Sequence, residues 1–259
     1  MTGRVLLTVV AGLAFANTAP AFAQLEPDRC AEYRGTLGER TVIGMSLLAH
    51  DQKLTGSYFY AKYLKDIALA GSYASARDIV LEERDASGKL QGKFTLRFVE
   101  SDPSRKSERP LTADVLRGTW SSASGQRSLP VYLALETMGG SQCTPRYAVA
   151  GASDDALVER NAQAFYNAVA KGQKTVAAKF VRYPVSFTLN GKRRKAANAA
   201  EFLQYYERIF TPAFVAKIAA GVPHHMFANA QGIMIADGAV WFDESGKVTV
   251  LNNGDRNAQ

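Results

Sequence analysis

The sequence predicts two domains, an all-β antiparallel domain followed by an α+β domain. Residues 28–148 hold short alternating segments separated by Gly and Asp turns, which is typical of an antiparallel meander. Residues 153–254 combine helical periodicity with hairpin signals. The pattern changes near residue 150, and the length of 259 residues exceeds that of one average domain.

The N-terminus has the three parts of a secretory signal peptide. Arg4 precedes an apolar run from Val5 to Ala16, and the small-residue segment AFA ends at Ala23. The apolar run is shorter than the roughly 20 residues that span a bilayer. We therefore predict cleavage after Ala23 and a periplasmic or secreted protein with no stable membrane insertion. The alternatives are a membrane anchor and a buried helix. Removing residues 1–23 lowers the formal net charge from +7 to +6.

The two cysteines of the chain are expected to form a disulfide. Cys30 and Cys143 are the only cysteines in the sequence. In an oxidising compartment, such an isolated pair favours a disulfide over a metal site. Neither cysteine stands in a motif of a catalytic thiol. A bridge would tie the start of the first domain to its end.

The first domain is predicted as a meander of about eight short strands. Segments 41–50 and 53–62 flank an Asp51-Gln52 turn, and segment 77–99 turns at DASGK. The phrases YRGTLG, LTGSYFY and LRGTW each place a Gly before a small residue in a strand, where Gly permits a bend or a close approach. Eight sequential strands favour an up-and-down barrel, which removes exposed sheet edges, with a sandwich as the alternative. The other strand segments are 66–75 and 127–136.

These Gly-containing strands resemble calycin-type barrels such as the avidins, over about 110 residues. The resemblance implies a meander barrel and transfers no ligand residue. Tyr58, Tyr60 and Trp120 are candidates to line a barrel mouth, and filling of the barrel interior is the favoured alternative. The polar segment 100–110, flanked by prolines, is expected to be a mobile surface loop.

The second domain is predicted to begin with helices and to end in a sheet. A Ser153/Asp154 cap starts a helical pattern that ends at Lys171-Gly172. A hairpin is expected to turn at Asn190-Gly191, and Asn198 starts a capping box for the next helix. Further elements are predicted as helices over 173–181, 199–210 and 211–221 and as three or four strands over 223–253.

Four of these elements resemble the nuclear transport factor 2-like fold, a cone-shaped α+β domain. They are the long first helix and the segments RYPVSF, EFLQYYERIF and GAVWFDESGKVTVLN, and the resemblance covers about 100 residues. It implies a pocket inside the cone in those members that are isomerases or dehydratases, and it allows a homodimer through the C-terminal domain. The fold also hosts plain binding modules, so the resemblance identifies no substrate.

The resemblance suggests which residues would face a pocket in the cone. The ligand-pocket candidates are Tyr183, Tyr206, Phe227, Met234 and Trp241. Amphipathic side chains such as Tyr and Trp suit a pocket wall, and core packing with one hydrogen bond is the alternative.

The candidates for catalysis are His225, Tyr183 and Asp237. Asp237 stands at an Asp-Gly turn, where Asp is also favoured for backbone reasons. Neighbouring residues of a strand point to opposite faces, so His224 and His225 would not bind one metal ion there, whereas in a loop they could. No H-x-H or C-x-x-C motif supplies a further ligand nearby, so no metal site and no cofactor are predicted. His50, at the end of a strand, is expected on the surface.

A basic run, Lys192 to Lys195, follows the predicted hairpin turn. Such a run can bind phosphate, anionic lipid or lipopolysaccharide. A charged edge strand that resists aggregation is the favoured explanation. Nucleic acid is not an expected partner, because the chain is predicted to be exported and the run lacks interleaved aromatic residues.

The sequence therefore favours a protein without catalytic activity. It contains no nucleophile elbow, no Gly-rich phosphate loop and no C-x-x-C motif. We predict an exported binding or interaction protein whose partner is a small molecule or an envelope protein. The alternatives are an isomerase- or dehydratase-type enzyme that works inside the C-terminal cone, and an inhibitor or immunity-type protein.

Overall fold

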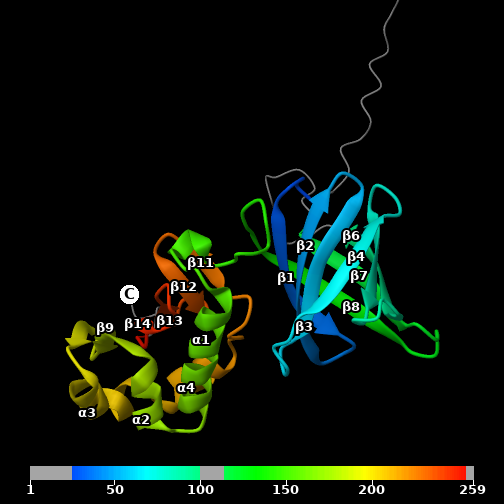
Figure 1. Cartoon of the computed structure of the whole chain (residues 1–259). Coiled ribbons are helices and arrows are strands. Elements are labelled where there is room, and N and C mark those ends of the chain that lie inside the picture. The colour runs from blue at the N-terminus through cyan, green and yellow to red at the C-terminus, as the bar shows by residue number, and fades with distance from the viewer. Residues whose placement is uncertain (1–24, 100–113, 255–259) are drawn as a thin grey trace, which may run out of the picture.

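The computed structural model describes residues 25–99 and 114–254 (Figure 1). The predicted leader (1–23) and the predicted polar loop (100–110) lie outside these residues. Within them, the chain forms a closed barrel and a second part built of helices and a mixed sheet. Among the helices of the described ranges, none combines the length and the apolar character needed to cross a membrane.

Eight antiparallel strands form the barrel in sequence order. They are β1 (Cys30–Leu37), β2 (Thr41–His50), β3 (Lys53–Tyr60), β4 (Ile67–Tyr73), β5 (Asp78–Arg84), β6 (Leu90–Val99), β7 (Val115–Ser122) and β8 (Ser128–Met138). The last strand, β8, pairs with β1 and closes the sheet. The closure confirms the predicted meander barrel and excludes the sandwich.

Alternate side chains of the strands fill the barrel interior. Phe94 of β6 is fully buried, and its ring meets that of Tyr58 edge-on, with centroids 5.1 Å apart. Trp120 stands opposite Phe94 in the β6–β7 ladder. Tyr58 and Trp120 both donate hydrogen bonds to Glu83 Oε2, at 2.9 and 3.2 Å. Both side chains are therefore part of the interior, and Tyr60 is half-buried beside Tyr58, with ring centroids 5.5 Å apart.

The predicted disulfide is present. Cys30 and Cys143 are bonded with their Cα atoms 5.0 Å apart and a sequence separation of 113 residues. Cys30 begins β1, and Cys143 follows β8 in the segment that leads to the second domain. The bridge thus holds that segment against the first strand of the barrel.

The second domain contains four α-helices, two 3-10 turns and six strands within the described residues. The helices are α1 (Asp155–Ala170), α2 (Lys174–Ala177), α3 (Ala199–Ile209) and α4 (Pro212–Ala219), and the 3-10 turns are η1 (Ala148–Ala150) and η2 (Ala178–Phe180). The strands are β9 (Val181–Leu189), β10 (Lys192–Ala196), β11 (Phe227–Asn229), β12 (Gly232–Ile235), β13 (Val240–Phe242) and β14 (Val248–Leu251). The sheet order is β10-β9-β14-β13-β12-β11, with β9 and β14 parallel and the other pairs antiparallel.

The helix starts lie where the capping signals predict them. Asp154 accepts a hydrogen bond from the Leu157 N–H at the start of α1. Asn198 accepts one from the Glu201 N–H at the start of α3, and the Glu201 carboxylate accepts one from the Ala197 N–H. These side chains satisfy backbone donors that have no partner inside the helix.

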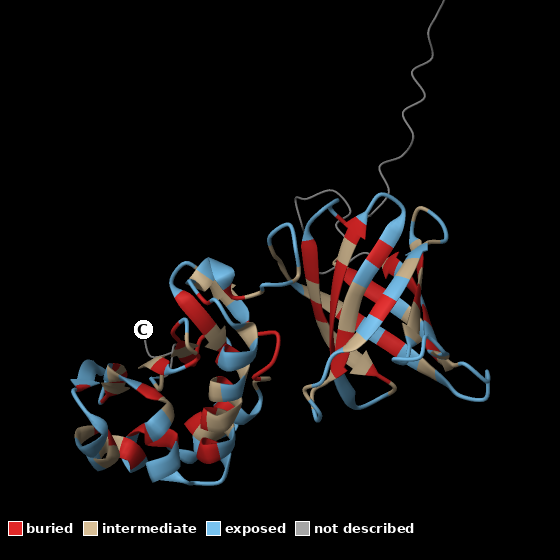
Figure 2. Ribbon diagram, in the orientation of Figure 1, coloured by how far each residue is buried: buried red, intermediate tan, exposed pale blue. Residues whose placement is uncertain are grey.

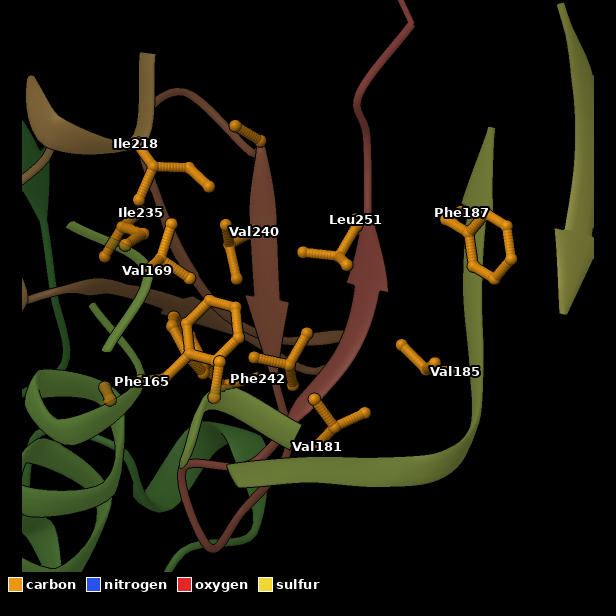
Figure 3. Packing of buried hydrophobic residues seen from close by; sticks show 14 of the residues in the cluster. Phe165, Val169, Val181, Val185, Phe187, Ile218, Ile235, Val240, Phe242 and Leu251 are labelled. Carbon is orange, nitrogen blue, oxygen red and sulfur yellow. The ribbon is translucent and has the colours of Figure 1, made fainter. Parts of the chain in front are cut away.

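Apolar side chains fill the space between the sheet and the helices (Figure 3). Phe165 of α1, Phe187 of β9 and Phe242 of β13 are fully buried. The rings of Phe165 and Phe242 meet edge-on with centroids 6.2 Å apart. The interior in which the resemblance implied a pocket is thus largely occupied by packed side chains.

Candidate functional site

The barrel and the second domain meet at the segment between α4 and β11. Its residues Pro223 to Met226 are buried, and Figure 2 shows this stretch in red on the side of the second domain that faces the barrel. In the described ranges, four polar or charged residues are buried, and three of them, Ser46, His224 and His225, lie here. Buried polar groups are rare and require partners, so this junction is the candidate site.

The backbone of this segment is a loop with a left-handed residue. His225 has φ +47°, a left-handed conformation that is uncommon for a residue other than glycine. The rings of His224 and His225 stack, with centroids 4.4 Å apart and planes inclined by 25°. The expectation that the two side chains diverge applied to a strand and does not hold in this loop.

An aromatic residue of the barrel surface covers both histidine rings. Phe59 of β3 follows the interior residue Tyr58 and therefore points outward, yet it is fully buried. Its ring meets the rings of His224 and His225 edge-on, with centroids 4.4 and 4.7 Å apart. Gly44 stands opposite Phe59 in the β2–β3 ladder, and a Cβ there would overlap the Phe59 ring. The missing side chain at Gly44 lets the ring lie against the barrel wall.

Gly44→Val is therefore expected to disturb the junction. The added side chain displaces the Phe59 ring, and such overpacking costs about 1–3 kcal/mol. Urea unfolding followed by circular dichroism measures the loss. Gly140→Val is the matched control, because nothing lies within 4 Å of a Cβ at Gly140. Equal losses in the two variants would contradict the role assigned to Gly44.

Both histidines face one carboxylate from the β3–β4 loop of the barrel. Asp66 Oδ1 lies 3.1 Å from His224 Nε2 and 2.9 Å from His225 Nε2. Asp66 Oδ2 lies 3.1 Å from His225 Nε2. The Asp66 side chain is 47% exposed, whereas the two histidine side chains are 7% and 5% exposed. Among Asp66, His224 and His225, solvent therefore reaches mainly Asp66.

The other ring nitrogens are held by groups from both domains. His224 Nδ1 hydrogen-bonds with Glu159 Oε2 of α1, and His225 Nδ1 lies 3.1 Å from Ser46 Oγ of β2. Glu159 Oε1 also accepts hydrogen bonds from the Tyr147 hydroxyl at 2.9 Å and from the His225 backbone N–H at 3.1 Å. Each ring is thus fixed in orientation at both nitrogens.

A second ion pair supports Ser46. The Ser46 hydroxyl donates to Glu32 Oε2 at 2.6 Å and accepts from Arg146 Nη2 at 3.3 Å. Arg146, in the segment between β8 and α1, also forms an ion pair with Glu32 Oε1. The Glu32 and Arg146 side chains are only 14% and 10% exposed. Charged groups of the barrel, the linking segment and the second domain thus form one continuous network.

The network shifts the pKa values of its members. Burial lowers the pKa of His224, but hydrogen bonds with Asp66 and Glu159 and the charges of these carboxylates raise it to about 9. For His225, burial dominates and the pKa lies below its usual value, with the Arg146 charge acting in the same direction. Burial raises the pKa values of Asp66 and Glu159, but hydrogen bonds with the histidines outweigh it and lower both.

Two clefts flank this network. The first, of about 450 Å³, is lined by barrel residues such as Arg34 and by His225 and Phe227 of the second domain. The second, of about 530 Å³, runs along the Cys30–Cys143 bridge. Met226 and Phe227 line both clefts, so the end of the buried segment and the start of β11 lie between them.

Two groups within the described residues bring metal-ligating atoms together. The ligand atoms of Asp66, His224 and His225 lie within 4.8 Å of one another. The other group consists of Cys30, Glu32 and Cys143. Its sulfurs are joined in the disulfide and offer no thiolate to an ion.

Four residues named as candidates from the sequence line the first cleft. They are His225, Phe227, Met234 and Asp237. Asp237 has a positive φ of 53°, as expected at an Asp-Gly turn. The cleft lies between the domains, whereas the sequence placed these residues inside the C-terminal cone.

The other three candidates lie elsewhere. Tyr183 and Tyr206 pack on Phe202, with ring centroids 6.2 and 5.9 Å apart, and Tyr183 donates a hydrogen bond to the Ala178 carbonyl. Trp241 is half-buried opposite Met234 in the β12–β13 ladder. The predicted pocket residues are therefore divided between the domain core, the sheet and the junction.

His50 is on the surface, 2.7 Å from Asp28, and the Lys192 to Lys195 run is exposed on β10.

Sequence reasoning missed most of the junction. Asp66 and Glu159 stand 158 and 65 residues from His224, and Ser46 stands 179 residues from His225. The one local signal was the His pair itself, in the apolar phrase VPHHMF. The chain matches no family model, no curated protein and no solved structure, so its function must be inferred from its own geometry.

Proposed function

We propose that the chain is an exported, non-enzymatic binding protein whose ligand site is the first cleft at the domain junction. The observation that carries the proposal is that both domains line this cleft. Its volume of about 450 Å³ falls within the roughly 300–1,000 Å³ of small-molecule sites. Sites of this kind occur preferentially between domains.

The lining of the cleft indicates the kind of ligand. It combines an apolar side with several charged groups, and a small molecule with an apolar body and ionic groups would match both. The apolar residues include Val42, Phe227 and Met234, and the charged residues include Arg34, Glu136 and Lys217. Val42 and Phe227 are 43% and 37% exposed, which leaves apolar surface free for a ligand to cover.

Two further observations support the proposal. The Cys30–Cys143 disulfide suits an oxidising compartment and agrees with the leader predicted over residues 1–23. The helices and mixed sheet of the second domain are compatible with a nuclear transport factor 2-like fold. Its interior holds Phe165, Phe187 and Phe242, which favours binding at the junction over a reaction inside the cone.

A ligand screen tests the proposal. The protein is produced with its own leader and collected from the periplasmic fraction, where its N-terminus is expected at Gln24. Small molecules that carry apolar and charged groups are then tested by ligand-observed NMR. Hits are expected to bind Met234→Trp at least 10-fold more weakly, because the larger side chain fills the cleft.

The control for this screen is Val176→Trp. Val176 is an exposed residue of α2 and lies outside the linings of both clefts. Unchanged binding to Met234→Trp would place the ligand outside the cleft, and conversion of a hit into product would show that the protein is an enzyme. Either result refutes the proposal.

A further inference from the structure

We propose that Asp66, His224 and His225 bind a divalent transition-metal ion of the class of Zn²⁺, Ni²⁺ or Co²⁺. The inference rests on the proposed function, ligand binding at the domain junction, and assigns a metal ion to the same junction. The three residues supply two imidazole nitrogens and a carboxylate, which is a donor set that such ions accept.

The spacing of the donor atoms fits one ion. In a tetrahedral site with metal–nitrogen bonds of about 2.0–2.1 Å, neighbouring donor atoms are about 3.3 Å apart. Asp66 Oδ1 lies 3.1 Å from His224 Nε2 and 2.9 Å from His225 Nε2. Small side-chain movements are therefore enough to admit an ion between the three groups.

The hydrogen-bond partners place a proton on Nδ1 of each ring and turn Nε2 toward Asp66. The Glu159 carboxylate has no hydrogen to donate, so His224 Nδ1 donates to it. The single hydroxyl hydrogen of Ser46 goes to Glu32, 2.6 Å away, so Ser46 Oγ accepts from His225 Nδ1. In a neutral ring with a protonated Nδ1, Nε2 presents a lone pair.

Both Nε2 atoms and the Asp66 carboxylate consequently face one point. In the absence of an ion, a proton on His224 Nε2 links that ring to Asp66, which agrees with the raised pKa of His224. A transition-metal ion can take the place of this proton, because a histidine nitrogen that binds a metal releases its proton. The three groups then serve as ligands of the ion.

The surroundings match those of known metal-binding histidines. A ligating histidine commonly donates its second ring N–H to a carboxylate or another fixed acceptor, which orients the ring. Glu159 and Ser46 hold His224 and His225 in this way. Nitrogen donors disfavour Mg²⁺ and Ca²⁺, which prefer oxygen ligands.

The site also has a path to solvent. Asp66 is 47% exposed, whereas the histidine rings are covered by the buried ring of Phe59. An ion can thus enter on the Asp66 side. Three protein ligands leave a fourth coordination position, which is typical of zinc sites that hold a water molecule or a ligand.

Isothermal titration calorimetry tests the inference. The tag-free protein from the periplasmic fraction is freed of metal with a chelator, dialysed and titrated with ZnCl₂, and CoCl₂ is added separately to record the visible spectrum of a tetrahedral site. One Zn²⁺ per chain is expected, with no comparable heat from MgCl₂. Asp66→Asn and His225→Gln are each expected to weaken Zn²⁺ binding at least 100-fold.

The variants separate a specific site from surface binding. Asp66→Asn alters a half-exposed residue, and circular dichroism checks that the variant is folded. Ser46→Ala leaves the three ligands in place and is expected to weaken Zn²⁺ binding about 10- to 100-fold, because His225 loses its fixed acceptor. His50→Gln is the matched control: His50 is exposed, hydrogen-bonds with Asp28 and is expected to leave Zn²⁺ binding unchanged.

Three results would overturn the metal inference: no Zn²⁺ uptake by the folded protein, equal uptake by Asp66→Asn, or an equal loss in His50→Gln. Failure of the metal inference and failure of the binding function are distinguishable. If Zn²⁺ does not bind but cleft ligands still bind and Met234→Trp still blocks them, only the metal inference falls. If neither binds, the proposed function falls as well.

Discussion

Glu159→Ala is expected to lower the free energy of unfolding by about 3 kcal/mol or more. Glu159 accepts hydrogen bonds from His224, from the Tyr147 hydroxyl and from the His225 backbone N–H. Its removal leaves three buried donors without this partner, and each buried unsatisfied group costs about 1–3 kcal/mol. These donors lie in the second domain and in the segment that leads to it, so the loss is expected in the unfolding of the second domain.

Urea unfolding, followed by circular dichroism, measures this loss. Glu207→Ala is the matched control, because the Glu207 side chain is 76% exposed and pairs with Lys174 at 3.0 Å. Exposed ion pairs contribute little, so the control is expected to change the free energy of unfolding by less than about 1 kcal/mol. If Glu159→Ala loses no more than Glu207→Ala, Glu159 does not stabilise the buried histidine segment.

The double variant Cys30→Ala/Cys143→Ala is expected to lose up to about 5 kcal/mol. The bridge spans 113 residues, and a cross-link over so long a loop strongly restricts the unfolded chain. The bridge also holds the segment that carries Arg146 near β1, where Arg146 pairs with Glu32. Its loss is therefore expected to weaken the junction as well as the barrel.

Alanine suits this test, because Cys30 is only 1% exposed and a serine would bury an unpaired hydroxyl. Urea unfolding of the double variant is compared with that of the oxidised and the reduced native protein. The reduced protein and the double variant are expected to unfold at similar urea concentrations, both well below the oxidised protein. Equal midpoints for all three would show that the bridge adds no stability.

The barrel could be predicted from the sequence because its signals are local. Side-chain alternation and short turns define each strand, and the Asp51-Gln52 turn contains a left-handed residue, Asp51, with φ +52°. The number of strands suggested that the sheet closes into a barrel. The cysteine pair suggested that the start and the end of the first domain lie together. The β1–β8 pairing joins segments about 100 residues apart, so its register depends on non-local contacts that local patterns do not contain.

The helices and hairpins of the second domain could be predicted for the same reason, but its sheet order could not. Caps at Asp154 and Asn198 are short-range signals that mark helix starts. The parallel pairing of β9 with β14 joins the first and the last strand of this domain. Phe227 and Met234 were assigned to the cone because inward and outward faces of a sheet cannot be assigned without that order.

The junction was beyond sequence reasoning for a further physical reason. Phe59 follows an interior residue of β3, so the alternation predicts an exposed side chain. It is buried only because the second domain covers it. His224 and His225 converge on Asp66 only because the loop gives His225 a positive φ and stacks the rings. A motif search near the histidines cannot find a carboxylate 158 residues away.

The most direct test of the metal inference is a crystal structure of the protein crystallised with ZnCl₂, with diffraction data measured at the zinc absorption edge. We predict one anomalous peak per chain, about 2.0–2.1 Å from the Nε2 atoms of His224 and His225 and about 2.0–2.2 Å from an Asp66 oxygen. We also expect Glu159 and Ser46 still to accept from the two Nδ1 atoms. Ordered His224, His225 and Asp66 side chains with no peak between them, at a saturating zinc concentration, would contradict this prediction.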